Sequence, residues 1–99
     1  MAAELILAPE AELDIADACL WYENRRAGLG DEFLSAIDAS MERIRRQPEV
    51  FPVVHEAYRR ALVRRFPYAI FFEFEGVSIA VYALFHTARD PAKWRQRLA

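Results

Sequence analysis

The chain lacks several features that would assign it to a common class of protein. Its 99 residues include a single cysteine, Cys19, so no internal disulfide can form, and no cationic stretch precedes an apolar run at the N-terminus. Nothing in the sequence suggests export, and a cytoplasmic location is therefore expected. No stretch approaches the roughly 18 uncharged apolar residues that a spanning helix needs, so no membrane association is expected.

Motifs for cofactor chemistry are missing as well. The chain has two histidines and three glycines, and it contains no Cys/His cluster, no glycine-rich phosphate loop and no Ser/His/Asp set. We therefore expect no metal site, no cofactor and no hydrolase triad. What the chain does have is an apolar fraction of 55%, which is ample for one modest core in a single domain, residues 1–99.

Charge is distributed unevenly along the chain. Residues 1–50 carry eleven acidic and five basic residues, a net −6, whereas residues 51–99 carry four acidic and eight basic residues, a net +4, and the two halves sum to −2. Twelve of the thirteen basic residues are arginine. Arginine favours bidentate contacts with carboxylates and phosphates, although a GC-rich genome would enrich it without a functional cause. The basic half is suited to an acidic partner.

The N-terminal half has the pattern of one strand followed by two helices. Residues 5–7 form an apolar run too short for a helix, and from Glu10 the apolar residues recur at three- and four-residue intervals. Gly28 is expected to end the first helix with a positive φ. The second helix is expected to be capped by Gly30 or Asp31 and to end before Pro48. Its apolar stripe is Phe33, Leu34, Ile37, Met41 and Ile44.

The C-terminal half has the pattern of three strands, over residues 58–65, 68–75 and 77–86, the last two separated by a tight turn around Gly76. After Pro91 the tail, residues 92–98, is expected to form two helical turns. The sequence thus predicts an α+β fold of order β-α-α-β-β-β, in which an α-helical hairpin follows a short N-terminal strand and precedes a three-strand antiparallel meander with a short C-terminal helical tail.

Alternation along the strands predicts which face of the meander is buried. In the last strand Val77, Ile79, Val81, Ala83 and Phe85 are assigned to the core. In the middle strand the same face carries Tyr68, Ile70, Phe72 and Phe74, and in the first it carries Ala61 and Val63. The opposite, open face is then expected to present Arg60, Arg64, Tyr82 and His86.

Short motifs along nearly the whole chain occur in a consistent order. They are Asp14-Ile15 with Ala18, Trp21-Tyr22-Glu23, Gly28-Leu29-Gly30 with Phe33, Pro48 with Phe51-Pro52, Arg60, Phe66-Pro67-Tyr68, and His86 with Arg89-Asp90-Pro91 and Trp94. In these the chain resembles the RelE/ParE superfamily of toxins from type II toxin–antitoxin modules. The similarity is closest to the ParE-like branch, often called plasmid-stabilisation proteins, whose strand, helical hairpin and antiparallel sheet match the predicted order.

The resemblance implies a small toxin held in a hetero-oligomer by a cognate antitoxin whose C-terminal segment wraps it. ParE-like members are described as inhibitors of DNA gyrase that break no bonds themselves, whereas RelE-like members cut mRNA in the ribosomal A site. A third possibility is a protein that has kept the toxin fold as a non-toxic interaction module. Membership alone does not decide among the three.

Ribonuclease chemistry has candidate residues in this chain. Attack by a 2′-hydroxyl needs a base, an acid and cations for the phosphate, and Arg60, His86 and Arg89 are the residue types that supply them. The tail, however, offers Trp94 where the RelE branch typically has a stacking tyrosine, and the pI of about 5.7 is low for a protein that enters ribosomal RNA. The sequence therefore favours a binding protein over an enzyme.

Most of these residues also have a structural interpretation. His86 at a strand end is of the kind that hydrogen-bonds Asp90 or a backbone carbonyl to fix a turn, and Asp90 with Pro91 has the pattern of a helix cap. Arg64 and Arg65 either pair with Glu73 and Glu75 across the hairpin or meet an acidic antitoxin segment. These alternatives remain open at the level of sequence.

Two leucines on the first helix are expected to face solvent. Leu13 and Leu20 lie seven residues apart, opposite the stripe that contains Ile15, Cys19 and Tyr22, and are a candidate site for an antitoxin or a second toxin copy. The complete set of candidate binding residues is Leu13, Leu20, Arg60, Arg64, Arg65, Tyr82, His86, Arg89 and Trp94.

Overall fold

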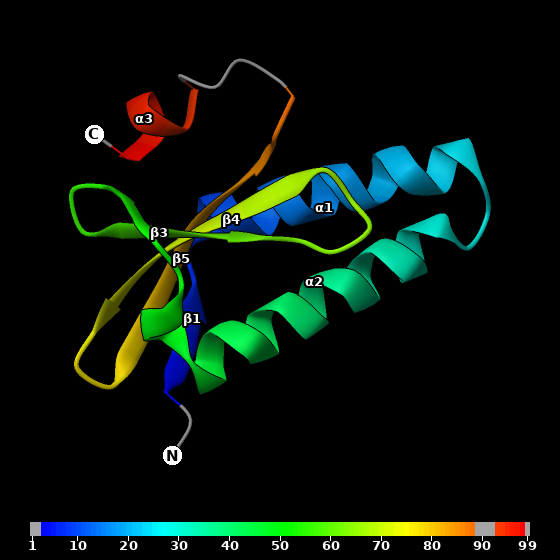
Figure 1. The fold of residues 1–99 in the computed structure, drawn as a ribbon. Coiled ribbons are helices and arrows are strands. Elements are labelled where there is room, and N and C mark those ends of the chain that lie inside the picture. The colour runs from blue at the N-terminus through cyan, green and yellow to red at the C-terminus, as the bar shows by residue number, and fades with distance from the viewer. Residues whose placement is uncertain (1–2, 89–92, 99) are drawn as a thin grey trace.

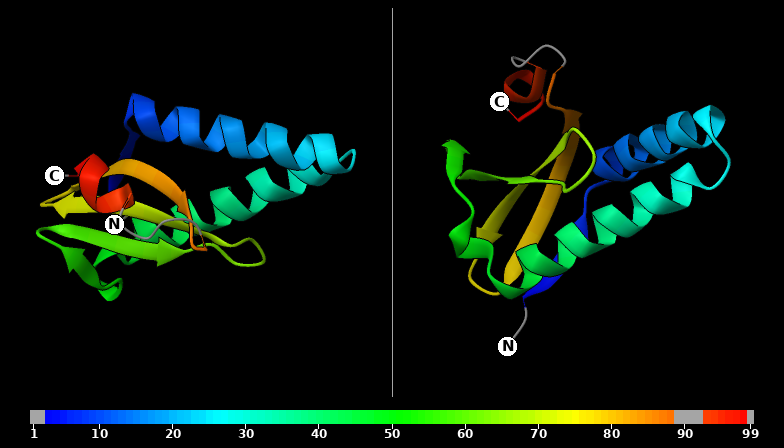
Figure 2. Two further views of the ribbon diagram at one scale, coloured as in Figure 1. Left: turned by 90° about the horizontal axis from the view of Figure 1, so that it is seen from above. Right: turned by 45° about the vertical axis from the view of Figure 1, so that its right-hand side comes forward.

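A helical hairpin lies across one face of a twisted five-stranded sheet, and a short C-terminal helix lies near the other face (Figures 1 and 2). The structure is a computed structural model and describes residues 3–88 and 93–98. Its elements are β1 (Glu4–Leu7), α1 (Pro9–Arg25), α2 (Leu29–Arg46), a 3-10 turn η1 (Pro48–Val50), β2 (Val53–His55), β3 (Tyr58–Leu62), β4 (Tyr68–Glu75), β5 (Ser78–His86) and α3 (Lys93–Leu98). The predicted α+β fold is confirmed, and the predicted elements occur in the predicted order, with one additional strand, β2, before the meander.

The sheet has the order β1-β5-β4-β3-β2, in which β1 runs parallel to β5 and the other neighbours are antiparallel. The strand β2 was not predicted. It has only three residues, follows Pro52 and pairs irregularly with β3. A strand this short has too few residues to show an alternating pattern in the sequence. The first meander strand is also shorter than predicted, since β3 ends at Leu62 and the chain then turns towards α2.

The connection between the two helices corrects the predicted caps. Gly28 does have a positive φ of 89°, but it directly precedes α2, and α1 ends at Arg25. Neither Gly30 nor Asp31 caps α2, because both lie inside its first turn. The Glu23 carboxylate of α1 caps it instead, accepting hydrogen bonds from the backbone N–H groups of Gly28 (3.0 Å) and Gly30 (2.9 Å).

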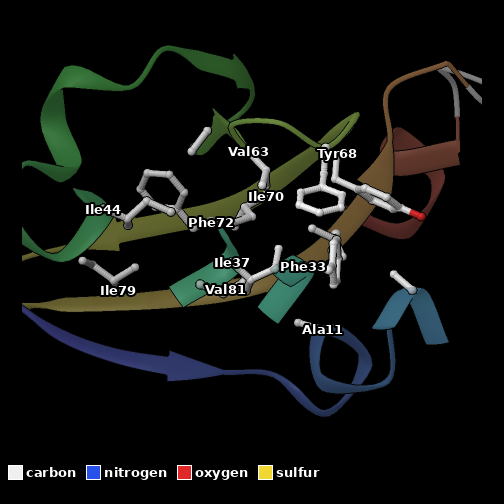
Figure 3. Close-up of a cluster of buried hydrophobic side chains, with 14 residues drawn as sticks. Ala11, Phe33, Ile37, Ile44, Val63, Tyr68, Ile70, Phe72, Ile79 and Val81 are labelled. Carbon is white, nitrogen blue, oxygen red and sulfur yellow. The ribbon is translucent and has the colours of Figure 1, made fainter. Parts of the chain in front are cut away.

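The main core lies between the hairpin and the sheet (Figure 3). Of the predicted stripe of α2, Phe33, Ile37 and Ile44 are buried there and Met41 packs against them, but Leu34 is 36% exposed and was wrongly assigned to the core. The buried residues of α2 meet the predicted core faces of β3 and β4, which contribute Ala61, Tyr68, Ile70 and Phe72, together with Val63 just after β3. Near the connection between α1 and α2, four aromatic rings pack with centroids 4.9 to 6.2 Å apart, those of Tyr22, Phe33, Phe66 and Tyr68. The Phe66-Pro67-Tyr68 motif is therefore part of the core and of the turn into β4.

A β-bulge in β5 overturns part of the predicted face assignment. Phe72 pairs with Val81 and Phe71 with Ala83, so Tyr82 is an extra residue that no β4 residue opposes. Ile79 and Val81 before the bulge are in the main core as predicted. One extra residue reverses the alternation, so Leu84 packs in the main core and Ala83 and Phe85 turn to the second face.

The second face of the sheet is partly covered, not open as predicted. Leu98 of α3 is buried there with Ala69, Phe71 and Ala83, and Tyr58, Tyr82 and Phe85 pack around them. The predicted helical tail thus has a packing role. Within the part of the chain that the structure describes, no helix is long and apolar enough to cross a membrane.

Candidate functional site

Arg60 and Tyr82 lie on the second face of the sheet. Arg60 is directly opposite Phe71 in the β3–β4 register, and the Tyr82 ring meets that of Tyr58 edge to face at 5.4 Å. The pKa of Tyr58 is raised, first by its burial in this cluster. The Arg60 side chain is exposed, and no side-chain hydrogen bond or ion pair involves it within residues 3–88 and 93–98.

His86 lies on the other face, because the bulge reverses β5 before it. It is paired with Tyr68, its ring lies 5.2 Å from the Tyr68 ring, and its Nδ1 accepts a hydrogen bond from the Ala88 N–H at 3.1 Å. His86 therefore fixes the turn after β5, as its structural interpretation proposed, although its partner here is a backbone N–H. It borders a pocket of about 280 Å³ that is also lined by Asp14, Asp17, Trp21 and Lys93. Arg60 lies on the opposite side of the sheet.

Arg64 and Arg65 lie on neither strand. They follow β3 in the segment that turns back towards α2, and Arg65 adopts a left-handed backbone with φ 74°, a conformation that costs a non-glycine residue roughly 1–2 kcal/mol. Arg65 Nη2 contacts Glu32 Oε1 at 3.0 Å, so of the two alternatives the pairing with Glu73 or Glu75 does not hold for this residue, and contact with an antitoxin segment stays a prediction. Strand pairing ends before Arg65, which removes it from the reach of those glutamates.

Glu32 is shared between two arginines. Its second oxygen, Oε2, contacts Arg26 Nη2 at 3.0 Å, and the hydrogen bond from Arg65, followed by the effects of Arg26, lowers the pKa of the Glu32 carboxyl. The three side chains are largely exposed, with 37% of the Glu32 side chain and 67% of the Arg65 side chain accessible, so each ion pair is weak.

A groove runs between α2 and the segment that follows β3. Its volume is about 510 Å³, and its lining is Glu32, Ser35, Ala36, Ala39, Ser40, Arg43, Arg64 and Arg65. Arg43 Nη2 donates to the Leu62 carbonyl and to Ser40 Oγ, both at 3.2 Å, which ties α2 to the end of β3. We call this region the arginine groove.

The hairpin exposes a strip of leucines. Leu13 is 65% exposed, Leu20 60% and Leu34 36%, and we call these three residues the hairpin leucine surface. Leu20 and Leu34 border an apolar depression of about 510 Å³ between α1 and α2, whose lining also includes Glu12 and Glu23. The structure places Leu13 and Leu20 on the solvent side of α1 as predicted, and their use as an interface stays a prediction.

Two residues with a clear role were missed by the sequence analysis. Asp14 Oδ2 accepts a hydrogen bond from the Leu84 N–H at 3.0 Å, and its two oxygens bind Arg97 of α3 at 3.0 Å each. Arg97 also lies over the Phe85 ring at 4.9 Å, and its hydrogen bonds to Asp14 raise the pKa of its guanidinium. Because the partners are 70 and 83 residues away in sequence, no local pattern could have indicated them.

The remaining predicted residues are not placed. Arg89, Asp90 and Pro91 lie outside the described residues, so the predicted cap and the role of Arg89 stay predictions. Trp94 belongs to α3, but its side chain is likewise outside the description. Among the residues that are described, no three histidine, cysteine, aspartate or glutamate side chains gather as a metal site would require.

The candidate residues thus fall on separate surfaces of a hairpin-and-sheet fold. The fold is similar to two solved structures. One chain comes from the chromosomal ParDE toxin–antitoxin system of P. aeruginosa, with a TM-score of 0.65 and 16% identity over 86% of this chain and 96% of that one. The other belongs to the toxin–antitoxin complex RelBE2 of Mycobacterium tuberculosis, with a TM-score of 0.61 and 11% identity over 87% and 99%.

The family follows from the sequence itself. Residues 5–91 match the model of the ParE toxin of the type II toxin–antitoxin system parDE, and the chain belongs to this family. Among curated proteins there is no match. The resemblance drawn from the sequence motifs is confirmed at this level.

Proposed function

We propose that the protein is a toxin that acts in the cytoplasm by binding DNA gyrase without breaking a bond itself, and that a cognate antitoxin neutralises it in a hetero-oligomer. Its membership of the ParE family supports the toxin role. The choice of gyrase rests on what the family resemblance implies for the ParE-like branch.

One observation carries the non-catalytic part of the proposal. A ribonuclease site needs its base and its phosphate-binding cation on the same side of the scissile bond, within hydrogen-bond reach of it. Here His86 lies on the hairpin-covered face beside Tyr68, and Arg60 lies on the second face opposite Phe71. His86 also uses Nδ1 to bind the Ala88 N–H. The two residues cannot act on one phosphate in this arrangement.

The alternative is a RelE-like mRNA interferase. A specific feature favours it: His86 and Lys93 border the same pocket as Asp14 and Asp17, so acid–base and cationic groups do meet at one place. The likeness of the fold to a chain of the RelBE2 complex is compatible with either target. Asp14, however, is already bound to Arg97, and the exposed carboxylate of Asp17 repels the charge of a phosphate, which makes this pocket a poor phosphate site.

Two assays on the purified protein separate the possibilities. We expect inhibition of gyrase supercoiling and no cleavage of mRNA on translating ribosomes. The His86→Ala variant should keep gyrase inhibition, and Arg60→Ala should weaken it if the second face contacts gyrase. Ribosome-dependent mRNA cleavage that is lost in His86→Ala would show that the interferase alternative is correct. Activity in neither assay, together with no growth arrest on expression, would identify a non-toxic interaction module.

Neutralisation by an antitoxin is tested separately from the target. The hairpin leucine surface is an exposed apolar strip on a helical pair, and a partner helix with leucine-like side chains at three- and four-residue spacing would bury it. Glu12 and Glu23 border the adjoining depression, so basic residues would flank such a helix. Co-expression with the product of a short neighbouring reading frame should yield a complex that survives size-exclusion chromatography.

A further inference from the structure

We infer that the arginine groove binds a short, extended and acidic segment of a partner polypeptide. The groove lies between α2 and the residues after β3, apart from the hairpin leucine surface and from the second face of the sheet. The inference goes beyond the proposed function, because it requires neither gyrase nor a particular antitoxin.

Charge is the first argument. Arg43, Arg64 and Arg65 line the groove and only one carboxylate, that of Glu32, lies among them. Arg43 donates to neutral oxygens of Ser40 and Leu62, so it keeps its full charge, and Arg64 is exposed without a hydrogen bond or ion pair among residues 3–88 and 93–98. The groove therefore has an excess of two positive charges (three minus one) in a chain whose net charge is −2. Carboxylates are the complement that guanidinium groups bind best in a polypeptide.

Shape is the second argument. The cations lie at both ends of the groove, with Arg65 against Glu32 near the start of α2 and Arg43 against the Leu62 carbonyl near its end. Glu32 and Arg43 are eleven positions apart, about 16 Å along a helix, which about five residues of extended chain would span. Between them Ala36 and Ala39 form a low floor that lets a backbone approach closely. The fitting segment has acidic residues at its ends and small or apolar ones between.

The same features favour a peptide over a nucleic acid. Apart from the Ser35 and Ser40 hydroxyls, the floor between the arginines is apolar and offers a phosphate backbone no donor. A net charge of −2 also repels a long polyanion at a distance while tolerating a few carboxylates. Glu32 already shows how a carboxylate is held here, bound to Arg65 and Arg26 at 3.0 Å. It occupies donors that the partner's carboxylates would use, and it therefore competes with them.

The probe is a fluorescein-labelled hexapeptide with glutamate at its first two and last two positions and leucine between them. We expect saturable binding by fluorescence anisotropy in low salt, and NMR amide shifts confined to residues 32–43 and 62–65. Arg64→Glu should weaken binding about tenfold, because it replaces an attraction with a repulsion. Glu32→Gln should tighten binding several-fold by removing the internal competitor.

The control is Arg45→Glu, which makes the same change of charge. Arg45 is two residues from Arg43 and so points about 200° around α2 from it, away from the groove. Arg65→Asn is a further variant, since asparagine tolerates the left-handed backbone but lacks the cation; it should fold normally by circular dichroism and bind weakly. The proposal is overturned if Arg45→Glu weakens binding as much as Arg64→Glu, if Glu32→Gln has no effect, or if a single-stranded oligonucleotide of equal charge shifts the same amides more strongly than the peptide.

This test is independent of the proposed function. Gyrase inhibition with no hexapeptide binding would refute peptide binding in the arginine groove and leave the toxin proposal intact. Hexapeptide binding without toxicity would refute the toxin proposal and leave peptide binding in the groove intact.

Discussion

Replacement of Asp14 should lower the stability of the fold through a small set of identified contacts. It accepts a hydrogen bond from the Leu84 N–H and holds Arg97 of α3 through both carboxylate oxygens, with all three contacts at 3.0 Å. The Leu84 N–H needs this acceptor because β1 pairs with β5 only as far as Val81, so α1 replaces the missing strand at that edge. Asp14 thus joins the hairpin, the sheet and the C-terminal helix.

The expected magnitude follows from what each variant leaves unpaired. In Asp14→Ala the Leu84 N–H loses its partner next to a buried side chain, at a cost of about 1–3 kcal/mol, and the partly exposed pair with Arg97 adds about 0.5–1 kcal/mol. We expect a loss of about 2–3 kcal/mol in the free energy of unfolding. Asp14→Asn keeps an oxygen for Leu84, and Arg97→Ala keeps the whole Leu84 contact, so each should lose only about 1 kcal/mol.

Urea denaturation followed by circular dichroism measures these differences, and Asp14→Ala should lower Tm by about 10 °C or more. Amide hydrogen exchange adds a local readout: exchange at Leu84 should accelerate in Asp14→Ala and stay slow in Asp14→Asn. Asp17→Ala is the matched control, since Asp17 is exposed on the same helix and has no hydrogen bond among the described residues. Equal losses in Asp14→Ala and Asp17→Ala, or unchanged exchange at Leu84, would refute the reasoning.

Two further predictions concern the hairpin. Leu20→Glu should reduce antitoxin co-purification about tenfold while changing stability by less than about 0.5 kcal/mol, whereas Leu62→Glu, at an equally exposed leucine of β3, should leave the complex unchanged. Equal recovery of both variants would exclude the hairpin leucine surface from the interface. Gly30→Ala should destabilise the protein by about 1–2 kcal/mol in urea titrations, although alanine is the better helix former by about 1 kcal/mol. The added Cβ would lie 2.9 Å from Glu23 Oε1 and 3.1 Å from the Cys19 carbonyl, so a stabilised variant would contradict this account of the α1–α2 contact.

Much of the fold could be predicted because its signals are local. The apolar spacing of α2, its end before Pro48 and the turn around Gly76 each follow from residues within a few positions of one another. The errors occur where the determining contact is distant. Glu23 caps α2 from the neighbouring helix, and β2 exists only because β3 offers it an edge.

The candidate site was harder to predict because one extra residue, Tyr82 at the bulge in β5, determines which face of the sheet each later residue of β5 occupies. Around the bulge, β5 is almost entirely apolar, so its sequence fits either alternation equally well, and nothing at Tyr82 marks an extra residue. The prediction that Arg60 and His86 share one face was therefore wrong. The register shift at the bulge places these two candidate catalytic residues on opposite faces of the sheet.

Several arginines of the basic half also have structural roles that the sequence did not indicate. Arg59 is bound to the Phe51 and Glu49 carbonyls at 2.7 and 3.2 Å, Arg97 to Asp14 and Arg65 to Glu32, so these side chains hold the fold together. The arginines left without such contacts among the described residues, Arg60 and Arg64, lie on opposite sides of the sheet. These two exposed charges therefore lie on different faces, and a partner that used both would have to pass around the molecule. A wrapping polypeptide with several short contacts fits that division of charge better than one compact docking surface.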